Sequence, residues 1–359
     1  KTEPYVFKKQ GHEVSFRVYL PSSGSKLLFI SYHRGKSKEG GISIHEQVPP
    51  IEKSEIKRVN PNVLTLDYVE LTMGKYQNDP MYFYQAANEI WKAHGFPDNP
   101  WVSSSQFKTE LVDAGPFPGN SGFTVTYPFY VADEAEISDM QVVVERPNLY
   151  TVSVNGTEVQ PVPYQTWLDP DFYAIDVGKL IKPGRNDIVL TASPFSIFCE
   201  LQPVYLLGDF SLVSRDKGWE VHSPRNLELG SWKDQGMPFY GQVVSYSRPF
   251  TANVEGVYII KLEAWEGTVA EVLIDGEHRG IIQSPPYQLK VDLPYGKYEI
   301  TVKVVGSLKN TFGPHHNVTR KGIVTPWSFK FAPEIQPPGE QYDLLDYGLY
   351  QDFEVYKKR

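Results

Sequence analysis

The stretches TVSVNGTEV (Thr151–Val159) and AEVLIDGEHRG (Ala270–Gly280) decide the fold, because each sets a two-residue turn between alternating apolar residues. Asn155-Gly156 and Asp275-Gly276 are dipeptides that the tight turns of β-hairpins favour. The two turns lie 120 residues apart, and similar strand patterns surround both. The sequence therefore predicts two copies of one β domain.

The repeat continues on both sides of these turns. The first copy begins TYPFYVADEAEISDMQVVVE and continues through FYAIDVGKLI to PGRNDIVLTAS. The second begins SYSRPFTANVEGVYIIKLE and continues through YQLKVDL to YGKYEITVKVVG. Each copy has about eight short strands, which is typical of a β-sandwich or jelly roll. We expect a first sandwich over 120–212 and a second over 213–359, the latter with a C-terminal tail.

Residues 1–119 form a smaller, strand-rich region before the repeat. EVSFRVYLPSSGSKLLFISY (13–32) has the pattern of a β-hairpin, and NVLTLDYVEL has that of a strand. One helix is predicted over about 79–95, where Asp79 suits the N-cap and Gly95 the C-terminal end. The expected fold class is all-β, with two tandem jelly-roll sandwiches after a region that holds one helix.

The composition excludes several classes of protein. Aromatic residues make up 14% of the 359 residues, with 29 Pro and 28 Gly, which favours strands and turns. The net charge of −8 argues against nucleic acid as a partner. The single cysteine excludes an internal disulfide framework. The sequence contains no apolar run of about 18 residues, so it predicts no membrane span. Because the chain starts at Lys1 without Met, we expect it to be a piece of a longer protein.

The order of the motifs fyaIDV, GRNDIVL, ELQPVYLLGDF, GMPFYGQVVSY, AEVLIDGEHRG and SLKNTFGPHH resembles that of a known family region. It is similar to the C-terminal accessory region of bacterial α-L-rhamnosidase-like glycoside hydrolases, over about residues 120–335. The resemblance implies galactose-binding-like sandwiches of the family 2 sugar-binding type. It also implies a periplasmic or extracellular bacterial protein that degrades plant or host polysaccharide.

The resemblance further implies a catalytic domain elsewhere in the parent protein, which would be a partner of this region. Residues 1–119 are too few for an eight-fold barrel of about 250 residues. We therefore expect a non-catalytic region that binds carbohydrate. Two alternatives stay open: a purely structural module that braces the catalytic domain, and a complete glycoside hydrolase whose carboxylate pair the sequence does not reveal.

A sugar-binding site needs an exposed aromatic ring edged by a few polar groups. Three parts of the chain fit this requirement: YQTWLDPDFY, GSWKDQGMPFYG, and KNTFGPHHNVT together with Trp327. For each tryptophan the alternative is a position in the core or at a domain seam. The candidate residues are Trp167, Asp169, Asp171, Tyr173, Trp232, Asp234, Gln235, Tyr240, His315, His316 and Trp327.

The adjacent histidines of KNTFGPHHNVT do not have the pattern of a metal site. In an extended segment neighbouring side chains point to opposite faces, so His315 and His316 would not grip one ion. A structural zinc site needs four ligands, and no HxH or HExxH motif is present nearby. We predict no metal or cofactor, although related sandwiches often hold a structural calcium that a sequence does not reveal. One histidine is expected to bond to backbone and the other to face a ligand or, preferably, a domain seam.

Glycoside hydrolysis needs two carboxylates on opposite sides of the bond that is cleaved. Three acidic pairs lie near aromatic residues: Asp169 with Asp171, Glu200 with Asp209, and Glu263 with Glu266. The first pair flanks Pro170 and is also typical of a turn, and the third lies at a strand end. No motif gives any of them a catalytic role, so no catalytic residue is predicted.

Overall fold

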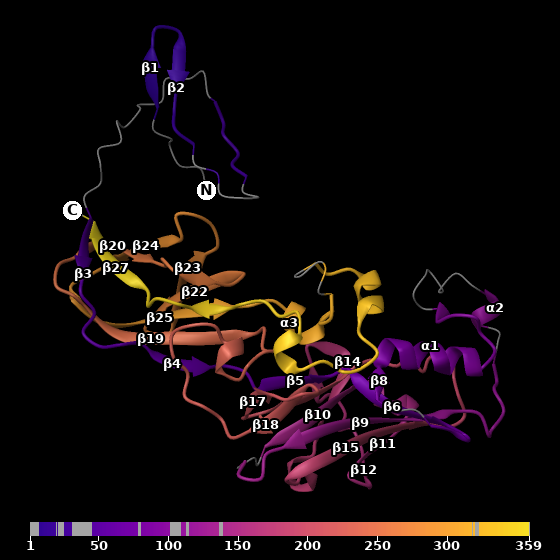
Figure 1. The fold of residues 1–359 in the computed structure, drawn as a ribbon. Helices are drawn as coiled ribbons and strands as arrows, with labels where there is room; N and C mark the ends of the chain where they lie inside the picture. The colour runs from indigo at the N-terminus through magenta and orange to yellow at the C-terminus, as the bar shows by residue number, and fades with distance from the viewer. Residues whose placement is uncertain are drawn as a thin grey trace.

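The computed structural model describes residues 7–18, 20, 25–30, 45–77, 80–100, 109–112, 115–135, 139–317, 319 and 323–358. These residues form two β-sandwiches with few and short helices (Figure 1), which confirms the predicted all-β fold. Each sandwich has its own hydrophobic core. No helix in the described part of the chain is long and apolar enough to cross a membrane.

The first sandwich consists of a five-stranded and a nine-stranded sheet. The five-stranded sheet has the order β13 (Thr166–Trp167), β14 (Asp169–Asp176), β10 (Met140–Glu145), β16 (Val204–Gly208), β5 (Asn62–Leu66). The other runs β12 (Thr157–Val159), β11 (Thr151–Val154), β15 (Gly184–Ala192), β9 (Phe123–Val131), β18 (Trp219–His222), β17 (Ser211–Ser214). It also holds β6 (Tyr68–Met73), which pairs with β9, β7 (Tyr76–Gln77) and β8 (Met81–Tyr82).

The second sandwich repeats this plan with fewer strands. One sheet has the order β23 (Glu277–Ile282), β22 (Val269–Ile274), β25 (Gly296–Val305), β19 (Val243–Ala252), β4 (Glu55–Arg58). The facing sheet has the order β24 (Gln288–Leu293), β20 (Gly256–Lys261), β27 (Glu354–Lys358), β3 (His45–Val48). Two small ribbons complete the strands: β21 (Trp265–Glu266) with β26 (Gly348–Leu349), and β1 (Lys8–Gln10) with β2 (Glu13–Ser15).

The two hairpin turns are built alike. Asn155 and Asp275 both have a backbone φ of 51°, and each is followed by a glycine with positive φ, as this turn requires. The Asn155 side-chain oxygen accepts a hydrogen bond from the Asp187 amide at 3.0 Å, and that of Asp275 accepts one from the Glu299 amide at 2.7 Å. The orders β12-β11-β15-β9 and β23-β22-β25-β19 are therefore equivalent, and the predicted repeat is present in the sheets.

Strand pairing crosses the boundaries that were expected at 119/120 and 212/213. From the N-terminal region, β3 and β4 join the second sandwich, whereas β5 and β6 join the first. β17 and β18, which follow residue 210, also pair with the first sandwich. The second sandwich is therefore assembled from two stretches of chain, and the first lies between them in sequence.

The helices are α1 (Phe83–Ala93), α2 (Thr109–Val112) and α3 (Lys309–Phe312), with 3-10 turns at η3 (Pro147–Leu149), η4 (Gly178–Leu180), η5 (Lys233–Gln235), η6 (Pro326–Phe331) and η7 (Gly339–Gln341). The apolar face predicted for α1 is buried, including Ile90 and Trp91. The helix begins later than predicted, because Met81 and Tyr82 pair with β6 as β8. The proposed cap, Asp79, lies outside the described residues.

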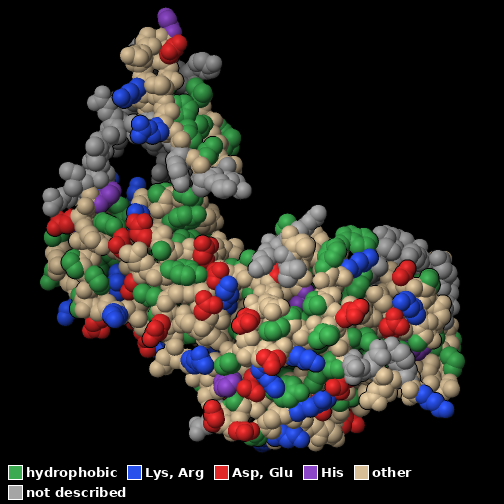
Figure 2. Space-filling model, in the orientation of Figure 1, with side chains coloured by type: hydrophobic (Ala, Val, Ile, Leu, Met, Phe, Trp, Pro, Cys, Tyr) green, Lys and Arg blue, Asp and Glu red, His purple; other side chains and the backbone are tan. Residues whose placement is uncertain are grey.

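The hairpin expected over 13–32 takes a different form. β1 and β2 make a short ribbon that projects from the second sandwich, and residues 16–18, 20 and 25–30 belong to no strand. Figure 2 shows apolar side chains gathered on this projection. Leu27, Phe29 and Ile30 are among those exposed.

Candidate functional site

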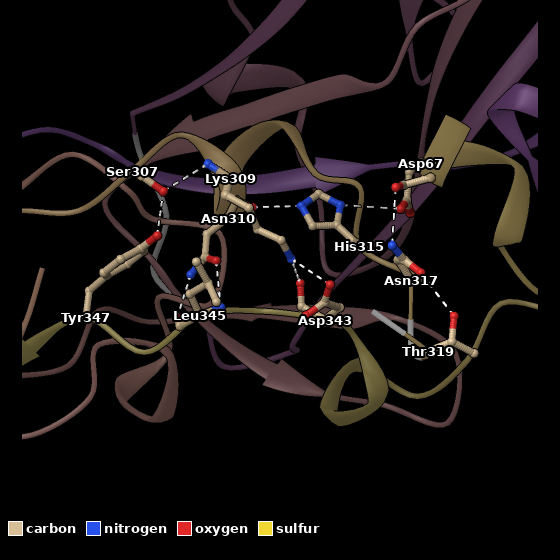
Figure 3. Close-up of polar contacts among 11 residues, drawn as sticks. Asp67, Ser307, Lys309, Asn310, His315, Asn317, Thr319, Asp343, Leu345 and Tyr347 are labelled. Atoms are coloured by element: carbon tan, nitrogen blue, oxygen red, sulfur yellow. Dashed lines mark hydrogen bonds and ion pairs between the residues drawn. The ribbon is translucent and has the colours of Figure 1, made fainter. Parts of the chain in front are cut away.

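The two adjacent histidines lie at the seam between the sandwiches, where His315 approaches Asp67 (Figure 3). Asp67 follows β5 of the first sandwich, whereas the histidines follow α3 and β25 of the second. His316 Nε2 donates to Asp67 Oδ2 at 2.8 Å, and His315 Nδ1 lies 3.7 Å from the same oxygen. His315 Nε2 donates to the Asn310 carbonyl oxygen at 2.8 Å. One histidine thus bonds to backbone and the other to the neighbouring sandwich, the seam arrangement that the sequence favoured.

Aromatic rings enclose this carboxylate and exclude water from it. Tyr342 donates its hydroxyl to Asp67 Oδ1 at 3.3 Å, and the rings of Tyr68 and Tyr82 lie edge-on to His316. Burial alone would raise the pKa of Asp67, but the adjacent histidines lower that pKa well below its usual range. Asp67 is therefore an ionised carboxylate in a buried site.

A buried ion pair continues the seam toward the C-terminal tail. Lys309 Nζ lies 3.2 Å from Asp343 Oδ2 and also donates to the Asp343 carbonyl oxygen. Asn310 exchanges two hydrogen bonds with the Leu345 backbone, at 2.8 and 2.9 Å. In the described ranges no three His, Cys, Asp or Glu side chains form a group that could hold a metal ion. The cluster is a polar clamp that holds the two sandwiches and the tail together.

The aromatic loop of the first sandwich also packs toward this seam. The ring of Trp167, which is half-buried, lies 5.4 Å from that of Tyr205 and 6.0 Å from that of Phe312 on α3. Its Nε1 has no hydrogen-bond partner in the described structure. The indole therefore contacts the second sandwich, which fits the seam alternative for this residue.

The two carboxylates of the same stretch lie in β14 (Asp169–Asp176), where the sequence had led us to expect a turn. The Asp171 amide donates to Asp169 Oδ1 at 2.9 Å, and Asp171 Oδ2 accepts from Arg146 Nε at 3.0 Å. The turn-forming role expected of the two carboxylates around Pro170 is therefore wrong, because the chain reverses one residue earlier, at Leu168, which has a φ of 61° and lies between the paired Trp167 and Asp169. Tyr173 lies within β14, opposite Val144 of β10, and is half-buried.

A carboxyl group that the sequence did not single out lies nearby. Burial, with the charge of Glu200 added, raises the pKa of Glu145 to about 7. Burial also raises the pKa of Glu200, whose Oε1 accepts from Gln202 Nε2 at 3.1 Å. Glu145 directly follows the buried run Val142–Val144 in β10, and this position was the sequence signal that could have indicated its burial. Asp209, the expected partner of Glu200, lies beyond the opposite end of β16 and pairs with Arg58.

The stretch GSWKDQGMPFYG lies mostly in the core of the second sandwich. Trp232 and Tyr240 are 1% and 0% exposed, and the Trp232 Nε1 donates to the Tyr246 hydroxyl at 2.9 Å. A buried ring cannot stack on a sugar. The prediction that Trp232 and Tyr240 bind carbohydrate is therefore wrong. Gln235 bonds to the backbone of its own loop, while Asp234 is exposed.

Trp327 differs from the other candidates because it is 58% exposed on η6. Lys330 Nζ lies 4.1 Å above its ring. Exposed apolar residues surround it in sequence: Ile323, Val324, Phe331 and Ile335. This apolar segment (323–335) is suited to contact with another protein surface.

A cleft of about 930 Å³ opens on the second sandwich beside β21 and β26. Trp265 in it is half-buried, Tyr347 is buried, and Tyr350 is 43% exposed. Trp265 pairs with Leu349, and the Tyr350 amide donates to the Ala264 carbonyl oxygen at 2.9 Å. These contacts hold the C-terminal tail against a loop that lies more than eighty residues earlier in the sequence. Trp265 from the loop and Tyr347 and Tyr350 from the tail form the aromatic wall of the cleft, which we call the Trp265 cleft.

Three carboxylates line the Trp265 cleft, and no Lys, Arg or His side chain does. Lys261 pairs with Glu263, and Lys233 Nζ lies 3.0 Å from Asp346 Oδ1. Although burial opposes it, hydrogen bonds from Ser231 and Lys233 lower the pKa of Asp346. Both lysines approach from outside the cleft lining.

Glu266, the third of these carboxylates, is exposed and has no hydrogen-bond or ion-pair partner among the side chains that the structure describes. The sequence predicts a solvated position at a strand end for Glu263 and Glu266, and both residues are exposed. The sequence could not show its neighbours Tyr350 and Asp346, because only the pairing of β21 with β26 brings them close.

The stretch GSWKDQG forms hydrogen bonds to residues that line the Trp265 cleft. The Trp232 amide donates to the Tyr347 carbonyl oxygen at 2.8 Å, and the Ser231 hydroxyl donates to Asp346 at 2.8 Å. A larger cleft, of about 1030 Å³, is lined by parts of both sandwiches, from Arg58 to Asp209, and has no aromatic side chain. Unlike this larger cleft, the Trp265 cleft combines aromatic rings with polar groups.

No protein-family model and no curated protein matches this sequence. Among solved structures, the chain is similar to a β-D-mannosidase from Dictyoglomus thermophilum, with 11% identity and a TM-score of 0.28 over 68% of this chain and 31% of that one. It is similar to a rhamnosidase from Novosphingobium sp. PP1Y, with 11% identity and a TM-score of 0.25 over 66% and 23%. A family 2 glycosyl hydrolase from Bacteroides cellulosilyticus gives 9% identity and a TM-score of 0.27 over 68% and 32%.

The chain thus spans less than a third of the length of each of these proteins. TM-scores this low carry no argument about the function of this chain.

Proposed function

We propose that this chain is a non-catalytic accessory region that binds carbohydrate in the Trp265 cleft. The observation that carries the proposal is an open cleft in which Trp265 and Tyr350 stand beside three carboxylates. Sugars have apolar C–H faces that stack on aromatic rings and hydroxyls that donate to carboxylates. Among the described residues, this cleft offers both kinds of contact together.

The proposal includes a parent protein of the α-L-rhamnosidase-like glycoside hydrolase type, with a catalytic domain as the second partner. It rests on the motif order of the repeat, which resembles that of these enzymes. A location outside the cytoplasm of a bacterium belongs to the same proposal.

A glycan array with the labelled chain tests sugar binding. Trp265→Ala and Tyr350→Ala should each reduce the signal strongly, because each removes a ring from the cleft wall. Tyr295→Ala is the matched control, since Tyr295 is 75% exposed on the same sandwich but does not line the cleft. Equal loss in all three variants, or no bound glycan at all, would remove the support for this function.

The apolar segment 323–335 favours a second function, that of bracing another domain. Trp327 and Phe331 are 58% and 62% exposed, which is unusual for large apolar side chains that lie close together in sequence. The test is thermal unfolding of the full-length parent protein with Trp327→Ser and Phe331→Ser. Bracing requires a lower unfolding temperature there and an unchanged one in the isolated chain.

Hydrolysis by the chain itself is a third proposal, favoured by Glu145 alone. A carboxyl group with a pKa of about 7 is suited to general acid catalysis. Release of reducing sugar from a glycan that the chain binds, and its loss in Glu145→Gln, would support hydrolysis. A wild-type chain that releases no sugar from any bound glycan would rule it out.

A further inference from the structure

The charges of the Trp265 cleft indicate which sugars it would accept. Its lining carries Glu263, Glu266 and Asp346 but no basic side chain. Lys261 and Lys233 offset two of these charges from outside, so the charge of Glu266 remains uncompensated. The whole chain adds to this negative potential, with a net charge of −8.

The two rings increase the preference for positive charge. The faces of Trp and Tyr rings attract cations that lie within about 6 Å of the ring centre. Trp265 is half-buried and Tyr350 is 43% exposed, so both are held in place by the protein yet open to a ligand. An ammonium group beside Glu266 would therefore meet a carboxylate and aromatic faces together.

We infer that the Trp265 cleft selects amino sugars with a free, protonated amine, as in deacetylated glucosamine oligomers, over neutral sugars and uronic acids. This inference rests on the proposed function, because it assigns a ligand class to the same cleft. The sugar rings stack on Trp265, and the amine lies at Glu266. A uronic acid is disfavoured because its carboxylate would face three others without a basic residue in the lining.

The test is calorimetric titration at low salt and about pH 6 with three oligosaccharides of one length: chitohexaose, cellohexaose and hexagalacturonate. Chitohexaose, here the fully deacetylated glucosamine hexamer, should bind about tenfold more tightly than cellohexaose, and hexagalacturonate should bind least. Glu266→Gln should weaken chitohexaose binding about fivefold and leave cellohexaose binding within about twofold. Hexalysine, a cation without sugar rings, should not compete.

Glu134→Gln is the matched control, because it removes one exposed carboxylate from the first sandwich and changes the net charge equally. If Glu134→Gln weakens binding as much as Glu266→Gln, or hexalysine competes, the preference is general charge attraction and the inference is overturned. If the chain binds cellohexaose and chitohexaose equally and Trp265→Ala abolishes both, the carbohydrate-binding function stands and the amino-sugar preference fails. If none of the three binds and the glycan array is also negative, the proposed function itself has failed.

Discussion

Asp67 of the first sandwich accepts a hydrogen bond of 2.8 Å from His316 of the second, and both side chains are almost fully buried. The two residues are 249 positions apart in the sequence. A buried carboxylate must be paired to persist, so this contact fixes the relative position of the sandwiches. The loop that carries His316, between β25 and β26, is therefore a clamp between the two sandwiches.

Asp67→Asn should lower the free energy of unfolding by about 2 kcal/mol, because an amide replaces the charged acceptor of two buried hydrogen bonds. Urea denaturation measures the change. Asp234→Asn serves as the control, since Asp234 is exposed and should shift stability by less than about 0.5 kcal/mol. Equal stability of the two variants would contradict the clamp.

The stability of the clamp should fall in acid, in two steps. The folded-state pKa of Asp67 lies below that of the unfolded chain, so its contribution is present above about pH 4 and is lost as the pH falls further. Burial lowers the pKa of His315 in the folded state, so the unfolded chain binds the extra proton below about pH 6.5. Unfolding free energies over about pH 3 to 8 test this. His315→Gln should remove only the loss of stability below about pH 6.5, and Asp67→Asn should remove only the loss below about pH 4.

Glu145→Gln should stabilise the chain by about 1 kcal/mol at pH 8, after allowance for the partial exposure of the side chain. The folded-state pKa of Glu145 is raised to about 7, so the folded protein holds a proton that the unfolded chain releases above about pH 4.3. Stability is therefore lost as the pH rises through 7 in the wild type and not in the variant. The gain should vanish at pH 4, and a gain of equal size there would argue against the raised pKa.

Gly276→Ala should cost about 1 kcal/mol, because Gly276 has a φ of +78° and a side chain is strained in that conformation. A Cβ at this position meets nothing within 4 Å, so the cost is one of backbone conformation. Gly119→Ala is a control with equally open space and no positive φ in the left-handed region. Thermal unfolding of both variants separates the two effects, and a neutral Gly276→Ala would contradict the turn assignment.

Trp232→Ala should cost about 4 kcal/mol, because it opens a cavity in the core of the second sandwich and removes one of the two hydrogen bonds that the Tyr246 hydroxyl accepts. Trp265→Ala should cost much less, since that ring is only half-buried. Denaturation of both proteins gives the comparison. A Trp232→Ala variant with wild-type stability would return Trp232 to the candidates for a ligand platform.

The repeat could be predicted from sequence because its signal is local. Asn155-Gly156 and Asp275-Gly276 form turns through their own backbone conformation, and the flanking alternation of apolar residues marks the buried faces. The strand NVLTLDYVEL could be recognised but not assigned to a sandwich, and β3 and β4 were not recognised because they lie in a polar stretch. Assignment of a strand to a sandwich depends on pairings such as Val244 with Arg58, which join residues nearly two hundred positions apart.

The candidate site was predictable only in part, for the same reason. His315 and His316 could be placed in a loop after the strand YEITVKVVG, but the sequence could not identify Asp67 as their partner. The Trp265 cleft was missed because Tyr350 and Asp346 reach it through the pairing of β21 with β26. Trp232 was predicted to bind sugar because it is an aromatic residue among polar ones, but it is buried in the core.

The most direct test of the account is calorimetric titration of the wild-type chain and Trp265→Ala with the oligosaccharide that binds best on the array. We predict saturable binding to the wild type at one site, a loss of affinity of at least about tenfold in Trp265→Ala, and similar unfolding temperatures for the two proteins. Unchanged affinity in a folded Trp265→Ala would contradict the assignment of carbohydrate binding to this cleft.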